Sequence, residues 1–199
     1  VPIERAILSA YAIGQGLNIG CGKIRLGNSV GVDIDPNVRT VDVVADGQTL
    51  PFETGSQDYV LALHNLEHYQ QSTLVILREW HRVLKPGGSL VLAVPDAQAV
   101  ASAVASGDLD TVLYDSPAGP IAAADVLWGL RKYVASGNVY YQHKTGFSQA
   151  TLRKRLTEAG FTVASIVSDN SYGLNALAMK PNGTPGFKLT PQGIVATPR

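Results

Sequence analysis

The sequence predicts an α/β fold: a mostly parallel sheet that ends in an antiparallel C-terminal hairpin, with a helical insertion after the fifth strand. Short apolar runs rich in branched residues recur along the chain. They are nearly continuous in apolarity rather than alternating, as in strands buried on both faces. Helical periodicity separates the later runs. With 199 residues and 45% hydrophobic content, the chain is long enough for one packed domain and short for two.

The first half of the chain supplies most of the strands. An amphipathic helix is expected over residues 3–11, and Gly14 and Gly16 break it before the first strand. Branched apolar runs then predict five strands, at residues 17–19, 29–34, 41–45, 59–63 and 89–94.

The later helices have recognisable ends. The first is expected over residues 72–85 and stops at a Lys-Pro-Gly-Gly turn. The second is expected over residues 148–159, with Ser148 as its N-cap. Two strands at residues 161–167 and 174–179 are separated by turn-forming residues, so they predict a closing hairpin.

An insertion and a tail complete the expected organisation. Residues 96–142 are rich in alanine, and a helix is expected over residues 121–135 because a proline precedes it and a glycine follows it. We expect this insertion to form a helical lid over one edge of the sheet. The domain then covers residues 1–180, and residues 181–199 form a Pro/Gly-rich tail that is a surface strap or disordered.

The first crossover helix has no room. About eight residues separate Gly22 from Gly31, whereas a parallel crossover normally takes a dozen or more. Eight extended residues span at most about 26 to 29 Å, and returning along a five-residue strand takes about 17 Å plus about 5 Å sideways. We therefore expect parallel neighbours joined by a loop over residues 23–28, with that helix shortened or missing.

Composition narrows the classes of partner. Lys plus Arg and Asp plus Glu number 16 each, which leaves no net field to attract nucleic acid or an anionic membrane. The single cysteine cannot form an internal disulfide, which fits a reducing, cytoplasmic compartment. No basic-then-apolar leader opens the chain, and the longest apolar stretch is interrupted by Pro95 and Asp96. We expect a soluble protein that acts on a small molecule.

A glycine turn and an acid follow the first two expected strands. Gly20, Cys21 and Gly22 form the turn, and Asp33 ends the second strand. Glycines let the backbone approach a ligand, and a carboxylate accepts hydrogen bonds from both ribose hydroxyls. Together they indicate a nucleoside-binding edge, although each also occurs as an ordinary turn.

Six blocks of sequence make the indication more specific. They are NIGCG (18–22), GVDIDP (31–36), ADGQTLPF (45–52), DYVLALHNLEH (58–68), LREWHRVLKPGGSLVLAVP (77–95), and HKTGFS with LTEAGF (143–148 and 156–161). Over about residues 17–179 the chain resembles the class I S-adenosylmethionine-dependent methyltransferases, specifically the small type 11-like group. The resemblance implies a Rossmann-like fold and the cofactor S-adenosyl-L-methionine, with S-adenosyl-L-homocysteine as product.

The resemblance also implies a set of cofactor-binding residues. The glycine turn would line the methionine part, Asp33 would hold the ribose hydroxyls, and Ile34 would lie against the adenine. Asp46 and Gly47, with Gln48 or Thr49, would meet the amino edge of the adenine. His64 and Asn65 would face the sulfonium. The full set is Gly20, Cys21, Gly22, Asp33, Ile34, Asp46, Gly47, Gln48, His64 and Asn65.

Elementary chemistry agrees with the acidic members of this set. The cofactor is a sulfonium without phosphate, so its site does not need the helix N-terminus that a pyrophosphate needs. Asp33 and Asp46 are acceptor-only groups that suit ribose hydroxyls and an exocyclic amine.

Histidines are the candidates for proton transfer, since their pKa lies near neutrality. His64 and His143 are the candidate catalytic residues. For His68 we favour a role in helix capping or packing over one in catalysis. His81 lies in the middle of a predicted helix and is assigned to packing. Cys21 is interpreted as a packing residue rather than a nucleophile, and no cluster has zinc-type spacing, so no metal is predicted.

Two other functions stay open. A nicotinamide-dependent oxidoreductase also needs a glycine turn and an acid, but Arg25 stands at the third-glycine position and the helix that receives pyrophosphate is missing. A catalytically inactive methyltransferase-like domain that binds cofactor or a protein partner is the third interpretation. The sequence leaves the acceptor atom (O, N or C) and the oligomeric state undetermined.

Overall fold

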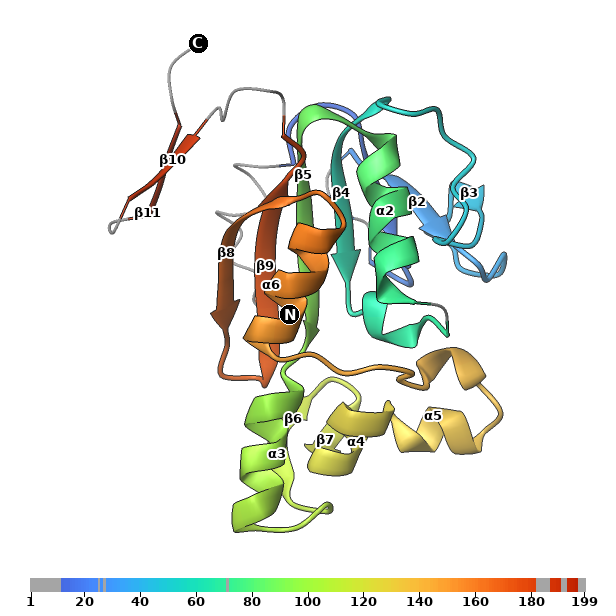
Figure 1. The fold of residues 1–199 in the computed structure, drawn as a ribbon. Coiled ribbons are helices and arrows are strands. Elements are labelled where there is room, and N and C mark those ends of the chain that lie inside the picture. Colours follow the sequence, from blue (N-terminus) through green and yellow to red (C-terminus); the bar gives the residue numbers. More distant parts are fainter. Residues whose placement is uncertain are drawn as a thin grey trace.

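The computed structural model describes residues 12–24, 26, 28–70, 72–181, 187–190 and 193–196. Its centre is a seven-stranded sheet in the order β3-β2-β1-β4-β5-β9-β8 (Figure 1). The strands that pair in parallel are β1 (Gly16–Ile19), β2 (Val30–Asp33), β3 (Val43–Val44), β4 (Gln57–Leu63) and β5 (Leu84–Pro95). Strands β8 (Thr162–Ser168) and β9 (Gly173–Met179) are antiparallel, so the predicted mostly parallel Rossmann-like sheet with a closing hairpin is confirmed.

The described residues of the first crossover form no helix, as the small number of residues between the two strands predicts. Strands β1 and β2 pair in parallel with Leu17 opposite Val30. In the described part of the link between them, turn hydrogen bonds replace helical ones, from Ile24 N to Cys21 O (2.9 Å) and from Ser29 N to Leu26 O (3.2 Å). The short loop therefore leaves the sheet order intact. The N-terminal helix expected over residues 3–11 lies outside the described residues.

Two helices cover one face of the sheet. Helix α2 (Thr73–Val83) and helix α6 (Gln149–Glu158) both lie in front of the strands in Figure 1. Their apolar residues join the largest core cluster, in which Trp80 and Leu152 are fully buried. Ser148 caps α6 as predicted, because its side chain accepts from the backbone N–H of Thr151.

The insertion departs from the predicted single helix. Helix α3 (Ala97–Ser106) is followed by an unpredicted hairpin, two short α-helices and a short 3₁₀ helix at the end of the sheet where β4 and β5 terminate (Figure 1). These elements are β6 (Val112–Ser116), β7 (Gly119–Ala122), α4 (Ala123–Trp128), α5 (Arg131–Ala135) and η2 (Val139–Tyr141). The helix expected over 121–135 was wrong in its start and its continuity, because the chain breaks at Gly129.

Gly129 breaks the helix for a reason that can be tested. Its φ is +91°, and a Cβ there would lie 1.8 Å from the carbonyl oxygen of Tyr141. We expect Gly129→Ala to destabilise the insertion by more than the roughly 1 to 2 kcal/mol of a left-handed alanine. Thermal unfolding and limited proteolysis measure this. Gly137→Ala is the matched control, because Gly137 has a φ of +92° and nothing within 4 Å of such a Cβ. Equal effects of the two changes would contradict the steric explanation.

Two smaller differences concern the strand β5 and the tail. The predicted turn over residues 85–88 is instead part of β5, where the register with β4 shifts and Gly87 takes a φ of +79°. In the tail, β10 (Phe187–Thr190) and β11 (Gly193–Ala196) form a separate antiparallel pair. Among the described residues, no helix is both long and apolar enough to cross a membrane.

Candidate functional site

The glycine turn and the acid that ends β2 are joined by a direct hydrogen bond. Gly20 and Gly22 have φ values of +63° and +50°, which favour glycine. The turn bonds back to β2 through Gly20 N and Val32 O, 2.8 Å apart. Gly22 N then donates to Asp33 Oδ2 at 2.9 Å. The first two sequence-predicted parts of the site are therefore one structural unit.

Asp33 keeps part of its acceptor capacity. Its Oδ1 accepts from Asp35 N at 3.0 Å and its Oδ2 from Gly22 N. An ionised carboxylate offers about four lone-pair sites. Among the described residues, two of these sites accept from the backbone, and the other two would suit ribose hydroxyls. The neighbouring side chain of Ile34 is 44% exposed, which suits an apolar contact with a flat base.

Cys21 belongs to the packing of the turn. Its side chain is buried, and its Sγ lies 3.6 Å from Thr40 Oγ1. Burial raises the pKa of the Cys21 thiol, and the contact with Thr40 opposes this only in part. A thiol held neutral is a weak nucleophile, which supports the packing interpretation; any contact of this residue with a ligand would come from its backbone.

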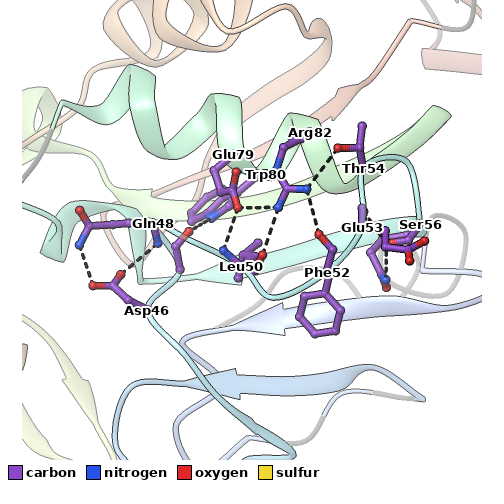
Figure 2. A network of polar contacts seen from close by, with 12 residues as sticks. Asp46, Gln48, Leu50, Phe52, Glu53, Thr54, Ser56, Glu79, Trp80 and Arg82 are labelled. Atoms are coloured by element: carbon purple, nitrogen blue, oxygen red, sulfur yellow. Dashed lines mark hydrogen bonds and ion pairs between the residues drawn. The ribbon is translucent and has the colours of Figure 1, made fainter.

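The loop after β3 carries the second acid. Gln48 N donates to Asp46 Oδ1 at 3.0 Å, and Gln48 Nε2 donates to Asp46 Oδ2 at 2.7 Å (Figure 2). Because the amide nitrogen faces the carboxylate, the amide oxygen points elsewhere; this Oε1 is buried and has no hydrogen-bond partner among the described residues. An orphaned buried acceptor beside a carboxylate fits a ligand that presents an amine, such as adenine.

The same loop is fixed to helix α2. Trp80 Nε1 donates to Gly47 O at 3.0 Å, and Glu79 Oε1 accepts from Leu50 N at 2.8 Å. Arg82 completes the network through Glu79 and the carbonyl oxygens of Leu50 and Phe52 (Figure 2). The hydrogen bond from Arg82 lowers the pKa of Glu79. This network anchors the loop that carries Asp46 and Gln48 to helix α2.

Tyr69 is a site residue that the sequence reasoning missed. Its hydroxyl donates to Asn65 Oδ1 at 2.8 Å, and it occupies the space that a Cβ on Gly47 would need, 2.1 Å away. Burial raises its pKa, and the charges of Asp46 and then Asp33 act in the same direction, against the bond to Asn65. Asn65 Nδ2 in turn lies 2.0 Å from a Cβ built on Gly20. Tyr69 thus connects Asn65, which follows β4, to Gly47 in the loop that carries Asp46.

The two candidate catalytic histidines meet at an unpredicted carboxylate. His64 follows β4 with a φ of +51°, and its Nδ1 lies 3.6 Å from Glu67 Oε1. His143 Nε2 lies 4.0 Å from the same oxygen. His68 packs edge-on against His143, with ring centroids 4.8 Å apart. His81 lies elsewhere and packs edge-on against Phe161, as a packing residue would.

Comparison with known families locates the match in the first half of the chain. The family model for a methyltransferase domain, the type 11 family, matches residues 11–92. The resemblance to class I S-adenosylmethionine-dependent methyltransferases is therefore confirmed over the strands and loops that carry the candidate site. Comparison with curated proteins gives no match.

Solved structures extend the likeness over most of the chain. A protein from Pyrococcus horikoshii shares 16% identity and superposes with a TM-score of 0.60, covering 89% of this chain and 87% of its own. A Thermotoga maritima protein, described as a methyltransferase and possible histamine N-methyltransferase, has 19% identity and a TM-score of 0.55, with 88% and 86% covered. A chain from a Haloferax volcanii complex of a methyltransferase and its activator has 16% identity and a TM-score of 0.57, with 89% and 88% covered. These likenesses establish the fold.

Proposed function

We propose that this chain transfers a methyl group from S-adenosyl-L-methionine to a small-molecule acceptor. One observation carries the proposal. Residues from four separate segments, at the ends of β1, β2, β3 and β4, are linked by contacts at one edge of the sheet. One contact joins Gly22 to Asp33. The others join Gly20 to Asn65, Asn65 to Tyr69, and Tyr69 to Gly47. Ligands of open α/β sheets bind at the carboxyl ends of the strands.

The donor set at this edge fits the cofactor. Asp33 would hold the ribose hydroxyls. Asp46 and the Oε1 of Gln48, which has no hydrogen-bond partner among the described residues, would receive the adenine amine. Of the residues that the structure describes, none lies within 4 Å of a Cβ built on Gly22, so this side of its backbone would leave space for the methionine end. The cofactor supplies a methyl group on a sulfonium, already activated for displacement.

The protein's task in such a reaction is alignment. In-line displacement breaks the sulfur–methyl bond as the bond from the methyl carbon to the acceptor forms, and the sulfonium becomes a neutral thioether. Holding both partners in this geometry supplies much of the acceleration. A hydroxyl or amine acceptor also loses a proton, and His64, whose side chain is partly exposed after the end of β4, would receive it in this proposal. His143 is buried farther back and would act through Glu67.

The insertion supplies the acceptor side in this proposal. Trp128 and Tyr140 are 51% and 60% exposed, and the rings of Tyr133 and Tyr141 lie 4.6 Å apart. Exposed aromatic side chains on a lid favour a partly apolar small molecule over a phosphate-rich polymer. The cytoplasm stays the expected compartment. No nucleic acid and no membrane surface is expected as a partner.

Turnover separates this proposal from the inactive alternative. Purified protein is incubated with methyl-labelled S-adenosyl-L-methionine and panels of hydroxyl, amine and carbon acceptors, and S-adenosyl-L-homocysteine release is measured. We expect product with at least one panel, and none when the acceptor is left out. Tight cofactor binding without turnover on any panel would favour an inactive domain that binds cofactor or a protein partner.

A further inference from the structure

Glu67 is a buried carboxylate that faces histidine rings rather than a lysine or an arginine. It lies in η1 (Leu66–His68), directly after the end of β4, with a side chain 1% exposed. Neither Oε1 nor Oε2 has a hydrogen-bond partner in the part of the chain that the structure describes. An isolated buried carboxylate costs several kcal/mol, so a group of opposite charge is required nearby.

Three imidazoles surround this carboxylate at more than hydrogen-bond distance. His64 Nδ1 and His143 Nε2 lie 3.6 and 4.0 Å from Glu67 Oε1. Direct hydrogen bonds from ring nitrogens are about 2.7 to 3.2 Å long. Two ligands that share one tetrahedral metal ion lie about 3.4 Å apart when each bond is about 2.0 to 2.1 Å. Of the proposed ligand pairs, Glu67 Oε1 and His143 Nε2 lie 4.0 Å apart, which is too long for a hydrogen bond and about 0.6 Å longer than the separation of two ligands on one ion.

Backbone carbonyl groups fix the proton on two of the rings. His68 Nδ1 lies 3.1 Å from Gln142 O, and His143 Nδ1 lies 2.9 Å from Val126 O. A carbonyl oxygen only accepts, so each Nδ1 carries the proton, and the neutral ring has its lone pair on Nε2. Metal-binding histidines are oriented in this way, with the other nitrogen donating to a carbonyl or carboxylate.

We propose that Glu67, His68 and His143 bind one divalent transition-metal ion, with His64 at the open side of the site. Each of the three residues offers one ligand atom, and these atoms lie within 4.8 Å of one another. Two imidazoles and one carboxylate form a ligand set typical of zinc and of non-haem iron(II). Backbone hydrogen bonds from Lys144 N and Thr145 N to Glu67 O hold η1 against the segment that follows His143.

An ion at this position would help an acceptor hydroxyl to lose its proton, an inference that rests on the proposed function. His64 and Asn65 directly follow β4, so an ion bound by Glu67 would lie near the position proposed for the sulfonium. A metal-bound hydroxyl loses its proton more readily than a free one. The site therefore favours an acceptor with an ionisable hydroxyl, which would become the attacking oxygen as its proton leaves to His64 or water.

Metal binding is measured directly, without the cofactor. Protein freed of metal with a chelator is titrated with Zn²⁺ in a calorimeter, and with Co²⁺ followed by visible absorption, which reports nitrogen and oxygen coordination. We expect about one ion per chain. Glu67→Gln keeps the shape of the side chain but removes its charge, and it should weaken binding at least about tenfold. His68→Ala changes a less buried ligand and should do the same if Glu67→Gln does not fold.

His81→Gln is the matched control, because it removes a histidine outside the cluster. It should bind Zn²⁺ as the wild type does. A wild-type protein that binds no ion, or ligand variants that bind as tightly as His81→Gln, would overturn the site and leave proton sharing between Glu67 and the histidines as its explanation. Affinity for S-adenosyl-L-homocysteine, measured on the same chelated protein, tests the proposed function separately.

Discussion

Asp33→Ala should weaken the binding of S-adenosyl-L-homocysteine by about ten- to a hundredfold. A hydrogen bond to a charged group contributes roughly 1.5 to 3 kcal/mol, which corresponds to that range of affinity. The carboxylate also accepts from Gly22 N, so its loss loosens the glycine turn against which the methionine end would lie. Both effects act in the same direction. Calorimetric titration of the purified variant with the product measures the change.

Two further variants separate the loss of a ligand contact at Asp33 from damage to the loop that follows β2. Asp35→Ala removes the same charge two residues later, where Asp35 Oδ1 accepts from Asn37 N and Nδ2. Its affinity should stay within about twofold of the wild type. Asp33→Asn keeps one acceptor oxygen and should give an intermediate loss. Unchanged affinity in Asp33→Ala, or equal losses in Asp33→Ala and Asp35→Ala, would refute the assignment of Asp33 to the ribose.

The short link between the first two strands shows what sequence alone can predict. The number of residues between Gly22 and Gly31 excludes a crossover helix, and the reach of an extended chain still allows parallel neighbours. The structure pairs β1 with β2 in this way. The length of the link was therefore enough to predict this pairing, because the constraint concerns only residues that are close together in the sequence.

The broken helix in the insertion shows where such reasoning ends. Residues 121–135 have helical composition and the expected flanking residues, yet the chain turns at Gly129 because the carbonyl group of Tyr141 occupies the space beside it. That contact arises only after the insertion has folded back on itself. Propensity is a weak prior against tertiary contacts of this kind.

The residues of the candidate site also fall into those that the sequence could predict and those that depend on tertiary contacts. Asp33, Asp46 and the glycines follow strands, so their meeting at one edge follows from the order of the sheet. Tyr69 was missed because its role depends on filling the space beside Gly47. Glu67 was missed because its histidine partners include His143, far along the chain. Its Leu-Glu-His context was the only local signal.

Trp80→Ala should be among the most destabilising single changes in the chain, with a loss of about 3 to 5 kcal/mol in the free energy of unfolding. Trp80 is fully buried in the core between α2 and the sheet, and it packs edge-on against Tyr69 with ring centroids 6.2 Å apart. Urea unfolding followed by circular dichroism measures the loss without relying on tryptophan emission. Trp128→Ala, at a side chain 51% exposed, should change stability by less than about 0.5 kcal/mol.

Trp80→Phe tests whether the core and the site are coupled. Phenylalanine keeps most of the buried area but cannot donate to Gly47 O, and a buried carbonyl left without its donor costs about 1 to 3 kcal/mol. Gly47 adjoins Asp46, so the loop that would meet the adenine loses its anchor while the rest of the sheet stays folded. We therefore expect Trp80→Phe to lower affinity for S-adenosyl-L-homocysteine several-fold at a temperature where the variant is folded. Wild-type affinity in that folded variant would mean that Asp46 and Gln48 hold their positions without the hydrogen bond from α2.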